Sequence, residues 1–179
     1  MAGGLVILKL KRTPGIYLVG FMGSGKSTLG QMLADELGWH FVDLDTDIEA
    51  REQCSISDIF ETRGEEAFRE IETAVISHWV HKVQRGRPTV LALGGGSFVR
   101  DPNYELLEEN GITVWLDCPL TVVEQRVARN SARPLARDSE RMRTLYHARL
   151  GAYGRADFRV DASGELADTL TLLLALPIY

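Results

Sequence analysis

Eight residues near one end of the chain combine glycines with a lysine and a serine in a spacing that suits phosphate chemistry. Residues 20–27 run Gly-Phe-Met-Gly-Ser-Gly-Lys-Ser, the pattern of a phosphate-binding loop. The glycines let the backbone wrap closely around phosphate oxygens, so that N–H groups point at the anion. The pattern predicts that Lys26 binds the terminal phosphates of a nucleoside triphosphate and that Ser27 ligates Mg²⁺.

Two aspartates follow the next apolar stretch, two residues apart. Asp43 and Asp45 come directly after residues 40–42. If a strand continues through them, their side chains point to opposite sides, so that one faces a metal ion and the other an acceptor molecule. Asp47 extends the alternation, but a carboxylate at the start of a helix is its favoured interpretation.

Three consecutive glycines and a run of arginines are the other unusual features. Residues 94–96 are all glycine, and a backbone that passes close to a bound ligand is favoured there over a flexible turn. Between residues 126 and 159 an otherwise acidic chain holds nine arginines. A solvated helix face explains such a run by default, whereas a nearby polyphosphate would give the guanidinium groups a ligand.

Apolar runs and helical patterns alternate from residue 16 onward, and these elements must position the residues above. Predicted strands cover residues 16–19, 40–42, 88–93, 112–116 and 158–160. Predicted helices cover residues 26–37, 57–60 and 65–83, a stretch after 119, and one from about 164. Strands that alternate with helices favour a parallel sheet with helices on both faces, a three-layer α/β/α fold. The first strand and helix flank the phosphate loop, which is the context it requires.

The composition limits the class of protein. A chain of 179 residues, 45% hydrophobic and 25% charged, suits a single folded domain. The net charge of −5 disfavours a nucleic-acid partner, and no apolar run approaches the roughly 18–20 residues that span a membrane. Two distant cysteines, Cys54 and Cys118, predict buried thiols rather than a disulfide or a zinc site. The apolar run at residues 5–8 is too short for a secretion signal, so a cytoplasmic location is expected.

The chain resembles the shikimate kinase family in a series of segments: residues 20–30, 41–45, 68–72, 94–96 and 133–135. Their order and spacing match along roughly residues 15–170. The resemblance implies a five-stranded parallel sheet of the nucleoside-monophosphate-kinase type, with a lid. It also implies ATP-dependent phosphorylation of the 3-hydroxyl of shikimate, with Mg²⁺, and we expect the enzyme to be a monomer.

The resemblance assigns nucleotide binding to one group of residues. They are Gly23, Ser24, Gly25, Lys26, Ser27, Thr28, Arg126 and Arg133. Arg133 matches a lid arginine that neutralises charge on the transferred phosphoryl group, so it counts with Lys26 as catalytic. Arg126 matches a position that packs against adenine. Ser27 and Asp43 match the metal site, Asp43 through a water molecule.

A second group is assigned to the acceptor: Asp45, Arg69, Gly94, Gly95, Gly96 and Arg149. Asp45 binds shikimate hydroxyls and is the candidate general base. Arg69 and Arg149 match the carboxylate-binding positions, since a guanidinium binds a carboxylate through two parallel hydrogen bonds. For Arg69 the sequence alone favours an ion pair with a neighbouring glutamate. Asp117, at the end of the fourth predicted strand, matches no metal ligand of the family, so it is not predicted to bind Mg²⁺.

The resemblance also divides the single kinase domain, residues 1–179, into parts. A core is expected at about 15–43, 86–125 and 155–179, a substrate-binding segment at about 44–85, and a lid at about 126–150. Two alternatives stay open: a kinase of another small hydroxy acid such as gluconate, and a nucleotide-binding regulator without phosphotransfer. A GTPase is disfavoured, because no asparagine is followed by lysine. No lysine or arginine follows Arg159 to contact adenine, and residues 1–14 lie outside the resemblance.

Overall fold

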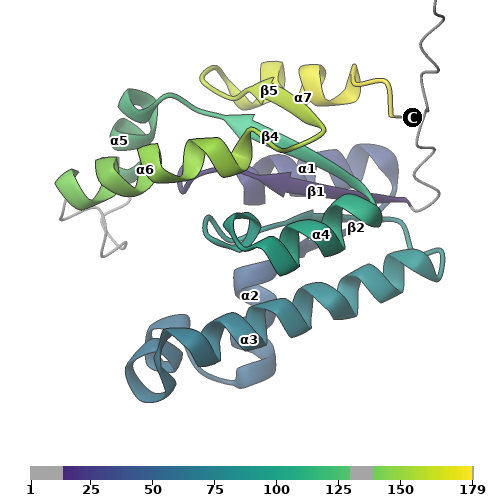
Figure 1. Ribbon diagram of the computed structural model, residues 1–179. Coiled ribbons are helices and arrows are strands. Elements are labelled where there is room, and N and C mark those ends of the chain that lie inside the picture. Colours follow the sequence, from purple (N-terminus) through teal and green to yellow (C-terminus); the bar gives the residue numbers. More distant parts are fainter. Residues whose placement is uncertain (1–13, 130–138, 179) are drawn as a thin grey trace, which may run out of the picture.

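Five parallel strands form the centre of the molecule, in the spatial order β2-β3-β1-β4-β5 (Figure 1). They are β1 (Gly15–Val19), β2 (His40–Asp43), β3 (Thr89–Ala92), β4 (Ile112–Asp117) and β5 (Phe158–Asp161). The computed structural model describes residues 14–129 and 139–178. Every neighbouring pair of strands is parallel, which confirms the predicted α/β class and the parallel sheet.

Helices cover both faces of this sheet. They are α1 (Lys26–Leu37), α2 (Leu44–Glu52), α3 (Ile56–Gln84), α4 (Asp101–Glu109), α5 (Leu120–Arg129), α6 (Ser139–Tyr153) and α7 (Leu166–Leu174), with a short 3₁₀ helix, η1 (Ser97–Val99). In Figure 1, α1 lies behind the sheet and contacts α7, whereas α4 and α6 lie in front of it. The kinked helix α3 packs on α2 and α4. The described residues thus form the predicted three layers.

The apolar runs form the central strands because those strands are covered on both faces. All residues of β1 and β3 are buried, and these two strands pair in register from Gly15 with Thr89 to Leu18 with Ala92. Since the strands are parallel, the loops after β1, β2 and β3 emerge at one edge of the sheet. Ligands of open α/β sheets bind at this carboxyl edge.

The helix after the phosphate loop forms over the predicted residues, from Lys26 to Leu37. Gly25 precedes it with φ of 94°, a left-handed conformation that side chains with a Cβ rarely adopt. Leu29 and Leu33 are buried on one face, which fixes the helix against the sheet. The loop therefore opens onto a helix N-terminus, where free N–H groups favour an anion.

The two helical stretches predicted at residues 57–60 and 65–83 both form, as the two arms of α3 on either side of the non-helical residue Gly64. The first arm begins at Ile56, after a capping box formed by Ser55 and Asp58, and the chain kinks at Gly64, where φ is 84° and ψ is 172°. Beyond the kink, Phe68, Val75, Ile76 and Trp79 are buried. This packing holds the helix that carries Arg69.

The prediction that Asp43 and Asp45 alternate along one strand is wrong. The strand β2 ends at Asp43, and Asp45 is the second residue of α2. The Asp43 carboxylate accepts a hydrogen bond from the Thr46 backbone N–H at 3.2 Å, so it caps a helix that starts at once. Asp47 lies in the first turn of α2, as expected of a helix-start carboxylate.

The composition also predicted two buried thiols and no apolar run long enough to span a membrane. Cys54 and Cys118 are free thiols, Cys118 buried and Cys54 half-buried. Burial raises the pKa of the Cys118 thiol, in keeping with a packed side chain. Within residues 14–129 and 139–178, no helix is long and apolar enough to cross a membrane.

Candidate active site

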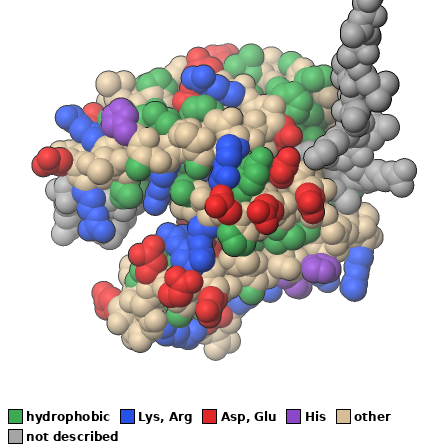
Figure 2. All heavy atoms as spheres, viewed as in Figure 1, with side chains coloured by type: hydrophobic (Ala, Val, Ile, Leu, Met, Phe, Trp, Pro, Cys, Tyr) green, Lys and Arg blue, Asp and Glu red, His purple; other side chains and the backbone are tan. Residues whose placement is uncertain are grey.

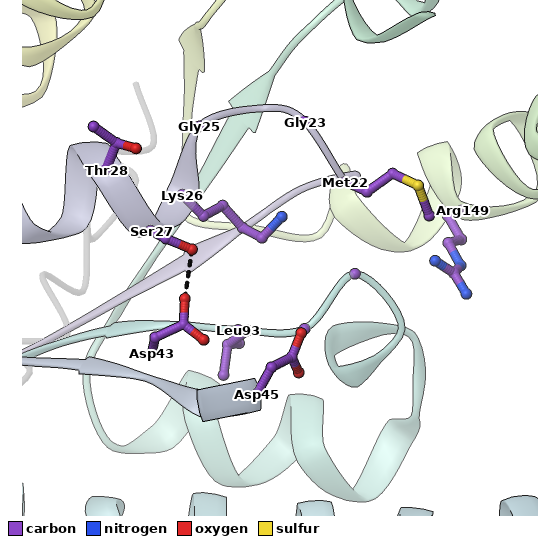
Figure 3. A pocket seen from close by; sticks show the side chains of 12 residues that line it. Met22, Gly23, Gly25, Lys26, Ser27, Thr28, Asp43, Asp45, Leu93 and Arg149 are labelled. Carbon is purple, nitrogen blue, oxygen red and sulfur yellow. Dashed lines mark hydrogen bonds between the residues drawn. The ribbon is translucent and has the colours of Figure 1, made fainter. Parts of the chain in front are cut away.

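A cavity of about 360 Å³ lies at the carboxyl edge of the sheet (Figure 3). It is lined by the phosphate loop, the end of β2, the start of α2, the glycine turn after β3, and Arg149 from α6. Seven of the predicted residues on the nucleotide and metal side meet the cavity or the loop that borders it: Gly23, Ser24, Gly25, Lys26, Ser27, Thr28 and Asp43. Asp45, Gly94, Gly95 and Arg149 line the same cavity. Segments far apart in the sequence therefore share one space.

The Lys26 side chain crosses the phosphate loop. Its ammonium donates hydrogen bonds to the Gly20 carbonyl at 2.9 Å and to the Phe21 carbonyl at 2.8 Å. These bonds hold the positive charge inside the loop, beside the helix N-terminus. An ammonium and a helix N-terminus at one place favour a bound phosphate.

The Ser27 hydroxyl faces Asp43, and the two side chains hydrogen-bond to each other (Figure 3). A hydroxyl oxygen and a carboxylate from neighbouring elements form a cluster of hard oxygen ligands, which suits Mg²⁺. The Ser24 hydroxyl is buried and has no hydrogen-bond partner among the described residues. An unpaired buried hydroxyl in this loop fits a site that contacts phosphate oxygens.

Asp45 is exposed to the cavity and lies against the glycine turn. A Cβ atom at Gly94 would come within 2.8 Å of the Asp45 Oδ1 atom. Real Cβ contacts are not that short, so a side chain at position 94 would displace the Asp45 carboxylate from this place. Asp43 and Asp45 therefore face one cavity from a helix cap and a first helical turn, and not from opposite sides of a strand.

A second pocket of about 290 Å³ lies beside the first, and Arg149 lines both. It contains Arg69 and Gly96, so the predicted acceptor residues are divided between two adjacent pockets. The structure is hollowed between the part built by α3 and the part built by α6, and charged side chains of both signs gather at the edge of the hollow (Figure 2). A Cβ at Gly96 would lie 3.0 Å from Arg69 Nη2, so this glycine leaves room for the guanidinium.

The sequence did not predict the buried network behind Arg69. Glu72 is 1% exposed and accepts hydrogen bonds from Arg69 at 3.1 Å and from the Ser97 hydroxyl at 2.6 Å. Asn103, also buried, donates to the Ser97 carbonyl at 2.9 Å and accepts from Thr73. The network fixes both the guanidinium and the end of the glycine turn. Its only sequence signal is Glu72 itself, three residues after Arg69 on a predicted helix.

Arg69 thus makes the ion pairs that the sequence alone favoured and also lines a pocket. It pairs with Glu72 and, at 3.3 Å, with the exposed Glu65. These ion pairs occupy only some of the donors of Arg69, because a guanidinium has five N–H donors. The remaining donors are those that a ligand carboxylate in the second pocket would need.

Three further predictions concern residues outside these pockets. The Arg126 guanidinium donates to the Gly164 carbonyl at 2.9 Å and to the Gly23 carbonyl at 3.4 Å, so it links the phosphate loop to the segment after β5. Its stacking on adenine stays a prediction. Arg133 lies outside the described residues. Asp117 pairs with Arg159, with 2.9 Å between its Oδ2 and Arg159 Nε, in keeping with its omission from the metal site.

The parallel sheet of order 2-3-1-4-5, with a phosphate loop after its central strand, is the architecture of a P-loop nucleotide-binding protein. Comparison with known proteins narrows this class. The family model described as shikimate kinase matches residues 22–174. A shikimate kinase of Persephonella marina is 40% identical over 151 residues, which are 84% of this chain and 90% of the relative. The chain belongs to the shikimate kinase family.

Solved structures agree with this assignment. A shikimate kinase from Acinetobacter baumannii in complex with shikimate is 36% identical, with a TM-score of 0.82 and coverage of 92% of each chain. A gluconokinase from Sinorhizobium meliloti is 20% identical, with a TM-score of 0.59 and coverage of 91% of each chain. The second similarity shows the shared fold alone.

Proposed function

We propose that this protein transfers the γ-phosphoryl group of ATP to the 3-hydroxyl of shikimate and yields shikimate 3-phosphate. The observation that carries the proposal is the juxtaposition in one cavity of the phosphate loop and an exposed carboxylate, Asp45. Figure 3 shows Lys26, Asp45 and Arg149 around the same space. Phosphoryl transfer depends mainly on positioning and charge stabilisation, and this arrangement offers both.

On the donor side, the loop backbone and Lys26 bind the β- and γ-phosphates. Lys26 already sits inside the loop through its two carbonyl bonds, so little reorganisation precedes binding. Ser27 and Asp43 would hold Mg²⁺, which when bound would supply charge neutralisation on the phosphates. The side chains of Ser27 and Asp43 hydrogen-bond to each other, so both already point to the same place.

On the acceptor side, Asp45 accepts the proton of the attacking hydroxyl. Arg69 and Arg149 bind the shikimate carboxylate from the second pocket, which contains the guanidinium groups of both. The glycines at 94–96 bring the backbone close to the ring. Placing the carboxylate beside two arginines and the hydroxyl beside Asp45 gives the ring a single orientation.

The remaining parts of the proposal rest on the resemblance. Arg133 approaches the transferred phosphoryl group from a lid at about 126–150, and the segment at about 44–85 binds the acceptor. From the sequence we expect a monomer that is located in the cytoplasm and does not bind nucleic acid.

A coupled assay of ADP release tests the proposal. Purified protein with ATP and Mg²⁺ is given shikimate, gluconate or no acceptor. We expect release that depends on shikimate, with the phosphorylated product identified by mass spectrometry. Faster release with gluconate would favour the other hydroxy-acid kinase, and equal slow release in all three arms would favour a nucleotide-binding regulator.

A further inference from the structure

One tyrosine joins the helix that carries Arg149 to the glycine turn. The Tyr153 hydroxyl, at the end of α6, donates a hydrogen bond to the Gly95 carbonyl at 2.6 Å. The two residues are 58 positions apart in the sequence. Tyr153 is 1% exposed, and its ring lies 6.1 Å from that of Trp115 in β4, measured between centroids. The hydroxyl is thus held in the core and reaches the wall of the candidate site.

The Arg149 guanidinium lies at the same place. A Cβ at Gly95 would be 3.3 Å from Arg149 Nη1, and a Cβ at Gly96 would be 3.4 Å from Nη2. Burial raises the pKa of Tyr153 to about 12, against the nearby Arg149 charge, which lowers it. The phenol therefore keeps its proton at neutral pH and remains a donor to the carbonyl.

The glycine turn needs such a restraint. Three glycines in succession have wide conformational freedom, and a buried bond to one carbonyl removes much of it. Ser97 is fixed by Glu72 and Asn103 at one end of the turn. The Tyr153 bond fixes the middle of the turn relative to α6, and hence relative to Arg149.

We propose that Tyr153 is a positioning residue for the acceptor: its hydroxyl sets the distance between the Gly95 backbone and the Arg149 guanidinium. The inference rests on the proposed function, because it gives these two groups a common ligand. Tyr153 itself lines neither pocket, so it acts through Gly95 and Arg149 and not by touching shikimate.

The same helix offers a matched control. Tyr146 is also buried, at 8% exposure, and its hydroxyl donates to the Cys118 carbonyl at 3.1 Å. Cys118 lines neither pocket. Tyr146→Phe and Tyr153→Phe therefore each delete one buried hydroxyl bonded to a backbone carbonyl and keep the ring, but only the second touches the glycine turn.

The test measures kcat and the KM of each substrate for the full chain and both variants, with melting temperatures. For Tyr153→Phe we expect the KM for shikimate to rise about five- to tenfold, the effect of one lost hydrogen bond, with the KM for ATP unchanged. For Tyr146→Phe we expect both KM values to stay at the wild-type level. A similar fall in melting temperature for both variants would separate the shikimate effect from loss of stability.

A double-mutant cycle with Arg149→Lys sharpens the test. If Tyr153 acts through Arg149, its substitution raises the KM for shikimate less in the Arg149→Lys background than in the wild type. Equal effects in both backgrounds, an unchanged KM for shikimate in Tyr153→Phe, or a Tyr153→Phe protein that fails to fold would each overturn the positioning role. Absence of shikimate phosphorylation by the wild type would instead reject the proposed function, before any variant is compared.

Discussion

The donor and acceptor sides of the cavity are built in different ways. Most of the donor side is one continuous stretch, residues 20–28, in which Lys26 bonds to carbonyls five and six residues away; Asp43 joins it from the end of β2 by its bond to Ser27. The acceptor side comes from α2, α3, the glycine turn and α6, and its bonds join residues 25 and 58 positions apart. A local loop keeps its geometry if its neighbours shift, whereas an assembled site depends on every element that contributes to it.

This difference predicts how each side responds to substitution. On the donor side, a single change removes a charge from a loop whose backbone stays in place. On the acceptor side, a change behind the site, at Glu72 or Tyr153, alters the position of groups that contact the ligand.

The largest effect is expected on the donor side. Lys26→Met removes the ammonium from the phosphate loop and should lower kcat at least about a thousandfold, because the charge that stabilises the transferring phosphoryl group is lost. The far-UV circular dichroism spectrum and the melting temperature should stay near those of the wild type. Turnover within a few-fold of wild type would reject the role of the phosphate loop.

The next largest effect is expected at Asp45, which lines the cavity that the phosphate loop shares with the acceptor residues. Asp45→Asn keeps the size of the side chain but removes its negative charge, so we expect a loss of about a hundredfold in kcat with ATP binding little changed. Single-turnover transfer at saturating shikimate measures the chemical step, and calorimetry measures binding separately. If the variant transfers phosphate at the wild-type rate once saturated, Asp45 orients the acceptor and is not its base.

On the acceptor side, the effect should fall on one substrate only. Arg69→Lys and Arg149→Lys should each raise the KM for shikimate about tenfold and leave the KM for ATP near its original value, because lysine lacks the planar pair of donors. Steady-state kinetics with each substrate varied in turn provides the measurement. An increase confined to the KM for ATP would show that these arginines contact the nucleotide and not shikimate.

The smallest effect concerns two histidines, His40 and His78, whose rings both contact Trp79. His40 and His78 lie 5.2 and 5.5 Å from the Trp79 ring, and Trp79 donates to Asp47 on α2. Burial, followed by nearby positive charges, lowers the pKa of both histidines below the ordinary 6.5. Their neutral forms are favoured in the folded state, so their contribution to stability is complete above pH 6.5 and is lost as the pH falls through the lowered values.

We therefore expect the melting temperature to drop between pH 7.5 and pH 5.5 by about two degrees more in the wild type than in a His40→Gln, His78→Gln variant. Thermal unfolding at both pH values measures the difference. Identical pH dependence in the two proteins would show that other groups control acid stability.

The class of fold and the prediction of a phosphate loop follow from short stretches of the sequence. Lys26 bonds to carbonyls five and six residues away, and the helix from Lys26 to Leu37 follows from its own apolar spacing. The alternation of apolar runs and helical patterns was sufficient to predict a parallel sheet, because buried parallel strands are apolar on both faces. These are short-range signals; the structure confirms the helix and the parallel sheet, and the roles of the loop residues stay predictions.

The assembly of the acceptor side depends on contacts between segments far apart in the sequence. The two-residue spacing of Asp43 and Asp45 suggested a strand, but the Asp43 side chain caps a helix there, and a cap is a competing local bond that alternation cannot reveal. The roles of Glu72 behind Arg69 and of Tyr153 beneath Gly95 depend on contacts across the folded chain. Such contacts form only when the core packs, so no short stretch of sequence contains them.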